Sequence, residues 1–148
     1  MSGEPGPKRP DRRAGPTVLV SDRQSEEVDA EGLAALAAEV LRGERAGDVE
    51  LSLSFVTEDE IAGLHERYMD ESGSTDVLSF ALDEDGLLGD VVVCPAVAAR
   101  NNPTDPGAEL RLLVVHGVLH LLGHDHEDDA DRAAMWERQE GYSGVRVP

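Results

Sequence analysis

Hydrophobic and polar positions along the chain follow two different periods. Between residues 49 and 55 apolar and polar side chains alternate strictly, which predicts a strand with one face in water. Residues 17–20 form a short β-branched run that predicts another strand. Two further apolar runs, 77–82 and 89–94, flank the acidic, glycine-containing turn 83–86. A turn of this kind favours an antiparallel pair of strands.

Between these runs, apolar residues recur every three or four positions, which is the period of a helix. Residues 33–41 show it first, with Asp29 as a plausible N-cap and Gly43 as a stop. Thr57 and Glu60 form a capping box that opens the next helix. Further helices are expected at residues 95–100, where Pro95 fits the first position, and at residues 130–140.

The segment from Leu110 to Leu122 is different because it is apolar almost all round. Asp105 and Pro106 are suited to the N-cap and the first helical position. Few polar residues interrupt the run beyond Arg111, His116 and His120. A helix without a polar face must be surrounded by protein, so this helix is expected in the core. The pattern predicts an α/β fold with about four strands and helices packed on the sheet.

Length and composition limit the organisation of the chain. A chain of 148 residues is expected to form one domain, which we assign to residues 17–142. Residues 1–16 are rich in Pro, Gly and basic side chains and are expected to be a flexible tail. Residues 143–148 are expected to be a short C-terminal tail.

Cysteine content, hydropathy and charge exclude several classes of protein. Cys94 is the only cysteine, so an intramolecular disulfide and a Cys-rich zinc module are excluded. The N-terminus lacks an apolar signal region, and no apolar run approaches the ~20 residues that span a bilayer. We therefore expect a cytoplasmic protein that is not inserted in a membrane. The net charge of −18 repels polyanions on average, which any role in nucleic-acid chemistry must overcome.

Four of the five histidines lie in the stretch HGVLHLLGHDH at 116–126. On a helix His116 and His120 are one turn apart, so both rings can point to one metal ion. Gly123 can adopt the left-handed conformation that ends a helix, which lets the chain turn back and bring His126 to the same ion. Three protein ligands leave a coordination position for water, whose pKa a metal lowers to about 7. The pattern predicts a hydrolytic metal centre, whereas His124 keeps an unassigned role.

The same stretch matches the metalloprotease pattern H-E-x-x-H-x-x-G-x-x-H at every position except the second. There a protease carries the Glu that acts as general base, and this chain has Gly117. The sequence thus predicts the three histidine ligands of such a protease without the Glu that peptide hydrolysis requires.

Three ordered blocks carry a family resemblance. HGVLHLLGHDH resembles the H-G-x-L-H-L-x-G-Y-D-H signature of the YbeY family, bacterial endoribonucleases known as rRNA maturation factors. STDVLSF at 74–80 resembles the family's P-T-D-V-L-S-F segment, and LLGDVVVC at 87–94 resembles its L-G-D-I-V-I strand. The blocks span most of residues 49–140 in the family's order and spacing.

The resemblance implies both a fold and an activity. It implies a small mixed four-stranded sheet flanked by about five helices, and one zinc ion held by His116, His120 and His126. Imidazole ligands also suit other divalent metals. The implied reaction is metal-dependent cleavage of single-stranded RNA, in 16S rRNA 3′-end maturation and ribosome quality control. The implied partners are rRNA and the small ribosomal subunit, reached through a ribosomal protein, and no role on DNA is expected.

The chain departs from the family pattern at several positions. Met69 stands where the family has Arg, His65 where it has Asn, and His124 where it has Tyr. Besides a metal-bound water, the catalytic candidates are His65, His124, Thr75 and Asp76, because two more imidazoles can supply protons near neutral pH. Thr75 and Asp76 can equally serve to cap the following strand. The alternatives are a ribosome-assembly adaptor with a largely structural metal, and a metal-dependent hydrolase of another substrate class.

Overall fold

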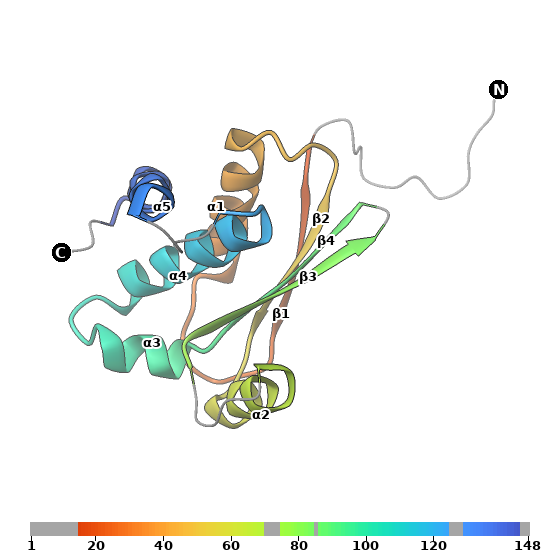
Figure 1. The fold of residues 1–148 in the computed structure, drawn as a ribbon. Helices are drawn as coiled ribbons and strands as arrows, with labels where there is room; N and C mark the ends of the chain where they lie inside the picture. The colour runs from red at the N-terminus through yellow and green to blue at the C-terminus, as the bar shows by residue number, and fades with distance from the viewer. Residues whose placement is uncertain (1–14, 70–74, 85, 125–128, 146–148) are drawn as a thin grey trace.

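The chain folds into a four-stranded sheet with helices on both faces, as seen in a computed structural model that describes residues 15–69, 75–84, 86–124 and 129–145 (Figure 1). The strands are β1 (Thr17–Asp22), β2 (Glu50–Phe55), β3 (Val77–Glu84) and β4 (Leu87–Val93). The helices are α1 (Ala30–Gly43), α2 (Glu58–Met69), α3 (Pro95–Asn101), α4 (Pro106–Leu121) and α5 (Asp129–Ser143). The tail expected at residues 1–16 lies almost wholly outside the described residues.

The sheet is mixed, as expected. Its strand order is β1-β2-β4-β3, in which β1 pairs parallel to β2 and β2 parallel to β4. The hairpin of β3 and β4 supplies the antiparallel pair, with Val77 opposite Val93. The alternation predicted for β2 is confirmed, since Leu51, Leu53 and Phe55 are fully buried and the residues between them are not.

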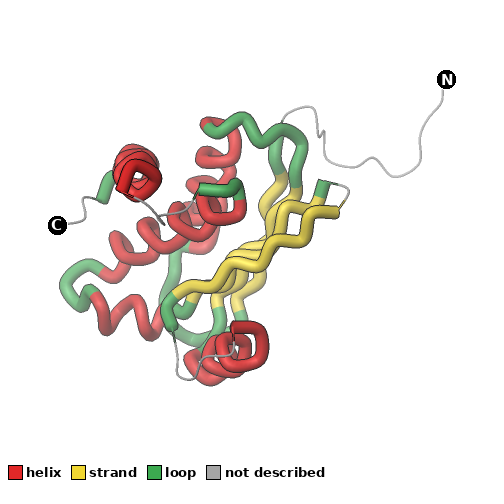
Figure 2. Tube along the Cα trace, in the orientation of Figure 1, coloured by secondary structure: helices red, strands yellow, loops and turns green. Residues whose placement is uncertain are grey.

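Two apolar clusters lie on opposite faces of the sheet. The larger joins α1, α4 and α5 to β2 and β4 through residues such as Leu41, Leu53 and Val114. The smaller lies under α2 and includes Ile61 and Val92. Figure 2 shows α1 and α4 on one side of the strands and α2 at one end of the other side. Most of the apolar core therefore surrounds α4.

A strand extends beyond its predicted bounds where pairing continues past the apolar pattern, whereas the predicted helix caps are confirmed. Strand β4 begins at Leu87 instead of residue 89, because the ladder with β3 includes Glu84 opposite Leu87. Helix α4 begins at Pro106, as predicted, and the Asp105 carboxylate accepts a hydrogen bond from the amide of Ala108 at 3.1 Å. The expected caps of α1 and α2 are confirmed, through the side chains of Asp29 and Thr57.

Gly117 brings α4 directly onto the sheet. A Cβ atom at this position would lie 2.7 Å from Cγ1 of Val91 and 3.2 Å from Oγ of Ser79. The Ser79 hydroxyl donates a hydrogen bond to the Gly117 carbonyl at 3.1 Å, which joins β3 to α4 at the same point. The helix and the sheet are thus too close for any side chain at residue 117.

We expect Gly117→Ala to lower the free energy of unfolding by about 1–3 kcal/mol, since the added methyl group must displace Val91 within a packed core. Gly63→Ala on α2 is the matched control, because no atom lies within 4 Å of the added carbon. That substitution should instead stabilise the protein by about 0.5–1 kcal/mol through helix propensity. Urea denaturation midpoints measure both. Unchanged stability of Gly117→Ala would contradict the close packing.

Candidate metal centre

The second half of α4 presents His116 and His120 side by side. Both side chains are partly buried, and their ring centroids are 4.8 Å apart with an interplanar angle of 62°. Two imidazoles this close can both reach an ion that lies about 2.0–2.1 Å from each ligating nitrogen. The two rings are therefore neighbours, as their spacing predicts, and their imidazole chemistry fits a metal ion; their role as ligands stays a prediction.

A buried amide lies within hydrogen-bond distance of the His116 ring. Oε1 of Gln139 on α5 lies 2.9 Å from Nδ1 of His116, and Gln139 is only 4% exposed. With the amide oxygen as acceptor, Nδ1 carries the proton and Nε2 keeps the lone pair that a metal ligand needs. The Ser143 hydroxyl donates to the backbone carbonyl of Gln139 at 2.6 Å, in the last turn of α5.

The end of α4 has the left-handed backbone geometry predicted at Gly123. Gly123 has φ +97°, and its amide donates to the carbonyl of His120 at 3.0 Å. The amide of His124 donates to the carbonyl of Leu119, also at 3.0 Å. These two bonds form a Schellman motif, which reverses the chain after the helix. The predicted left-handed conformation at Gly123 is confirmed.

The third predicted ligand, His126, lies outside the described residues. Within the described residues, no group of three or more His, Cys, Asp or Glu side chains is arranged to hold a metal ion. The assignment of His116, His120 and His126 as a three-ligand set therefore stays a prediction, of which the structure shows the pair on α4.

The packing of Gly117 explains why this centre differs from that of a metalloprotease. The residue after the first histidine faces Val91 and Ser79 of the sheet at contact distance. A Glu side chain in that position would be driven into the apolar core, away from solvent and substrate. A general base cannot be placed there in this fold.

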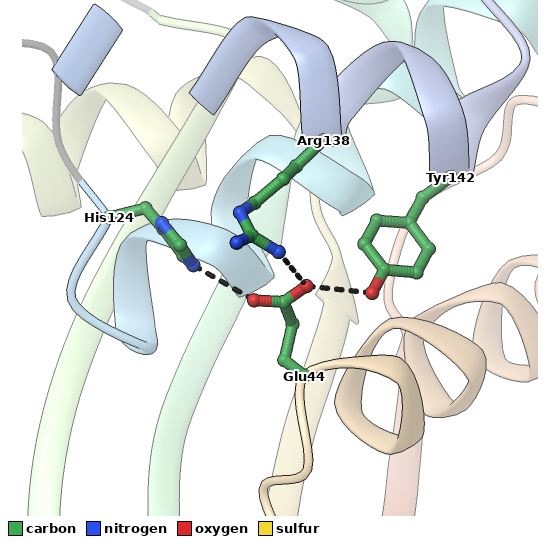
Figure 3. Close-up of polar contacts among 4 residues, drawn as sticks. All are labelled: Glu44, His124, Arg138 and Tyr142. Carbon is green, nitrogen blue, oxygen red and sulfur yellow. Dashed lines mark hydrogen bonds and ion pairs between the residues drawn. The ribbon is translucent and has the colours of Figure 1, made fainter. Parts of the chain in front are cut away.

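His124 is bonded to a carboxylate far away in the sequence (Figure 3). Its Nε2 lies 3.0 Å from Oε1 of Glu44, the residue that caps the C-terminal end of α1. The other oxygen of Glu44 accepts bonds from Nη1 of Arg138 at 2.9 Å and from the hydroxyl of Tyr142 at 2.7 Å. His124 therefore anchors the turn after α4 to α1 and α5.

The environment of this cluster shifts two pKa values. Burial by itself would raise the pKa of Glu44, but hydrogen bonds from Tyr142 and His124, with the charge of Arg138, outweigh it and lower that pKa. Burial and the hydrogen bond to the Glu44 carboxylate raise the pKa of Tyr142 to about 12. Glu44 is thus held as a carboxylate, and Tyr142 as a neutral donor.

Thr75 and Asp76 lie directly before β3, and Asp76 contacts α3. The carbonyl of Asp76 accepts a hydrogen bond from the amide of Cys94 at 2.9 Å, and its carboxylate accepts one from Asn101 at 3.2 Å. Burial, with a smaller contribution from the charge of Asp76, raises the pKa of Glu109 in the first turn of α4. These contacts favour a role of Asp76 in joining β3 to α3 over one in catalysis.

His65 belongs to α2, which packs against the face of the sheet opposite α4. A cleft of about 560 Å³ opens on that face, and its lining includes Arg23, Glu60, Tyr68 and Asp90. The structure therefore brings His116 and His120 together on α4 and places His124 against Glu44 in the turn that follows, while His65 lies on the other side of the sheet.

No local sequence pattern indicates Glu44 and Gln139 as the hydrogen-bond partners of His124 and His116. Glu44 is separated from His124 by 80 positions, and Gln139 from His116 by 23. Each stands among ordinary polar residues of an amphipathic helix or its cap, so their roles appear only in the folded chain.

These features define an α/β protein with a candidate metal centre on its central helix. The Endoribonuclease YbeY family model matches residues 19–144. The chain is 46% identical over 136 residues to the Endoribonuclease YbeY of Acidothermus cellulolyticus, covering 78% of this chain and 83% of that relative. It is 41% identical to that of Thermobifida fusca over 138 residues, covering 83% and 89%. The chain therefore belongs to the Endoribonuclease YbeY family, and the resemblance in the sequence motifs is confirmed.

The fold agrees with a solved structure. The solution structure of TM1509 from Thermotoga maritima superposes with a TM-score of 0.64 at 33% sequence identity, covering 86% of this chain and 87% of that one. No helix within the described residues is long and apolar enough to cross a bilayer.

The raised pKa of Tyr142 predicts how stability changes in alkali. Its folded-state pKa of about 12 exceeds the ordinary value of 10.0, so the neutral phenol stabilises the fold fully below pH 10. That contribution should be lost as the pH rises through about 12. We expect Tyr142→Phe to remove this part of the pH dependence, measured by urea unfolding between pH 8 and 12. Identical pH profiles for the two proteins would contradict the assignment.

Proposed function

We propose that the protein is a metal-dependent endoribonuclease that cleaves single-stranded RNA in 16S rRNA 3′-end maturation and ribosome quality control. The observation that carries the proposal is the pair of His116 and His120 on α4, with Gln139 within hydrogen-bond distance of His116. Membership of a family named for endoribonuclease activity supports the choice of RNA as substrate. Because Gly117 stands where a metalloprotease carries its general base, peptide hydrolysis is not the reaction that we propose.

We propose zinc as the metal, held by His116, His120 and His126. A bound zinc ion would supply Lewis-acid stabilisation of the phosphoryl oxygens and lower the pKa of a water to about 7. An amide oxygen of Gln139 as acceptor would favour the ligating tautomer of His116, and both rings are partly buried on α4. Because Met69 replaces the family's Arg, no arginine at that position can share the charge of the phosphate.

We expect His116→Ala to lower the rate of single-stranded RNA cleavage by at least about 100-fold, since removal of a ligand forfeits several kcal/mol of charge stabilisation. A chelator should abolish wild-type cleavage, and added zinc should restore it. Glu31→Gln, an exposed substitution in the first turn of α1, is the control for purification and folding. Cleavage of a labelled single-stranded RNA is the measurement.

The same assay separates the alternatives. Cleavage that survives His116→Ala would place the activity elsewhere or in a contaminant. Binding of small subunits without any cleavage by the metal-loaded wild type would favour the ribosome-assembly adaptor. A peptide pool in the same assay tests the hydrolase of another substrate class.

We further propose that contacts with a ribosomal protein, more than contacts with RNA, deliver the protein to the small subunit. The net charge of −18 opposes binding to a polyanion. In addition, Arg23, Arg100 and Arg138 each form an ion pair with a glutamate of this chain, at 2.6–2.9 Å. An arginine that already forms an ion pair attracts a phosphate backbone less strongly, because the glutamate partly neutralises its charge.

This proposal predicts that affinity for small subunits exceeds affinity for naked 16S rRNA at the same salt concentration. It also predicts a shallow salt dependence of subunit binding, because few counterions are released when few phosphates are neutralised. Equilibrium binding at about 50 and 200 mM salt measures both properties. Equal affinities with a steep salt dependence would contradict it.

A further inference from the structure

The cleft on the face of the sheet opposite α4 has no role in the proposed reaction. Its volume is about 560 Å³, within the range of about 300–1,000 Å³ that is typical of ligand pockets. Helix α2 lies at one end of this face, as Figure 2 shows, and the strands form the floor of the cleft. The cleft is therefore large enough for a small ligand or for one unit of a polymer.

Polar side chains lie on the floor of the cleft because of the register of the strands. In β2 the buried Leu51 and Leu53 belong to the core on the α4 side, so Ser52 and Ser54 face the cleft. Asp90 of β4 pairs with Ser52 and lies beside it on the same face. None of these three polar side chains forms a hydrogen bond or an ion pair within the described residues. Partly buried polar atoms are normally hydrogen-bonded, so this floor is suited to a polar ligand.

Aromatic side chains line the cleft beside this carboxylate. Phe80 of β3 is the antiparallel partner of Asp90, so the ring adjoins the carboxylate on the same face. Tyr68 of α2 meets Phe80 edge to face, with the ring centroids 5.5 Å apart and an interplanar angle of 71°. Tyr68 is 60% exposed, which leaves a large part of its ring accessible to a ligand. The cleft thus combines a stacking surface with a neighbouring hydrogen-bond acceptor.

An arginine without an ion pair lies next to the stacking surface. The guanidinium of Arg67 is 5.7 Å from the centroid of the Tyr68 ring, and it forms no ion pair with any residue that the structure describes. Arg23 at the cleft differs, because it is paired with Glu60 at 2.6 Å. A guanidinium suits a phosphate and disfavours a cationic ligand at the same ring. The three features together fit a ligand with an aromatic body, hydrogen-bond donors and an anionic group.

A nucleotide of single-stranded RNA has this combination. Unpaired bases stack on aromatic side chains of a protein and present their Watson–Crick edges to polar groups. Guanine has two adjacent donors on that edge, N1–H and the N2 amino group. An ionised carboxylate only accepts hydrogen bonds and has two oxygens, so it can accept both donors together. In adenine, cytosine and uracil an acceptor stands beside the donor and would face the carboxylate.

We propose that the cleft is a subsite for an unpaired guanine of the RNA substrate, with the base against Tyr68, its Watson–Crick edge at Asp90 and its phosphate at Arg67. The inference rests on the proposed ribonuclease function. The subsite gives an acidic chain a way to select single strands, since base contacts depend less on charge than phosphate contacts do. A base that is already paired cannot present this edge.

Strand β3 joins the cleft to the histidine pair. It is an edge strand of the sheet. Phe80 faces the cleft, whereas the preceding residue, Ser79, donates a hydrogen bond to Gly117 on the other face. Gly117 directly follows His116 on α4. An RNA strand held in the cleft would therefore reach the candidate metal centre by crossing one strand at the edge of the sheet.

The test measures the binding of four RNA pentanucleotides that carry G, A, C or U between flanking uridines. Fluorescence anisotropy is recorded in a chelator, so that metal-dependent cleavage does not intervene. We expect the guanine oligonucleotide to bind at least about 10-fold more tightly than the other three, the usual effect of a pair of hydrogen bonds to a base edge. Inosine in place of guanosine removes only the N2 amino group and should lose most of this preference, in a test that needs no protein variant.

Two variants test the roles of the side chains, each checked for folding by circular dichroism. Asp90→Asn should abolish the guanine preference, because an amide offers one acceptor and one donor; Asp48→Asn, the same change of charge at an exposed position outside the lining, is its control. Tyr68→Ala should weaken binding of all four oligonucleotides by about 5- to 100-fold through loss of stacking. Trp136→Ala removes another exposed aromatic, on α5, and should have no effect.

Nuclear magnetic resonance locates the bound nucleotide. On addition of guanosine monophosphate the backbone amide signals of Ser52 and Ser54 should shift, and adenosine monophosphate should shift them less. A poly-arginine peptide is titrated in parallel. Shifts of both amides with the peptide, and with no nucleotide or oligonucleotide, would overturn the guanine subsite and assign the cleft to a basic segment of a protein.

The outcomes separate this inference from the proposed function. Equal affinity for the four oligonucleotides, or an undiminished guanine preference in folded Asp90→Asn, would overturn the subsite alone if the metal-loaded protein cleaves RNA. A guanine preference that depends on Asp90, in a protein whose metal-loaded form cleaves no RNA, would support the subsite and overturn the nuclease. Absence of both binding and cleavage would overturn both proposals.

Discussion

The contact between α4 and the sheet is the constraint on which the rest of the structure depends. Helix α4 is apolar on nearly every side, so it can only exist surrounded by other elements. Gly117 allows it to lie against Val91 and Ser79 without an intervening side chain. With this face fixed, the rotation of the helix is fixed too, and His116 and His120 can point in only one direction. The candidate metal centre is a consequence of how the core is packed.

The same contact limits the chemistry. A fold that needs glycine after the first histidine cannot also place a carboxylate there, so the histidine pair on α4 lacks the general base that a metalloprotease carries at that position. The polar groups that burial brings into the interior must then find partners in the protein. Gln139 meets that need for His116, and its amide oxygen as acceptor would favour the tautomer suited to ligation. One hydrogen bond thus satisfies a buried amide and contacts a candidate ligand.

Charged residues around the turn that follows α4 are also paired within the protein. Only 9% of the Glu44 side chain is exposed, and its pKa is lowered despite this partial burial because three donors surround it. Such clusters contribute little net stability compared with an apolar core, but they are sensitive to geometry. Here the cluster connects the ends of α1 and α4 to α5, so the three helices around the histidines are fixed relative to one another.

Local patterns in the sequence were sufficient for much of the fold. Period-two alternation identified β2, the apolar run identified the buried α4, and Asp105 and Gly123 marked features at its two ends, because each depends on residues within a few positions. Spacing alone also paired His116 with His120. The order of the strands, the partners of the buried histidines and the start of β4 were decided by the tertiary structure. Glu44 meets His124 across 80 positions, and such a contact forms only when helices far apart in the chain pack together.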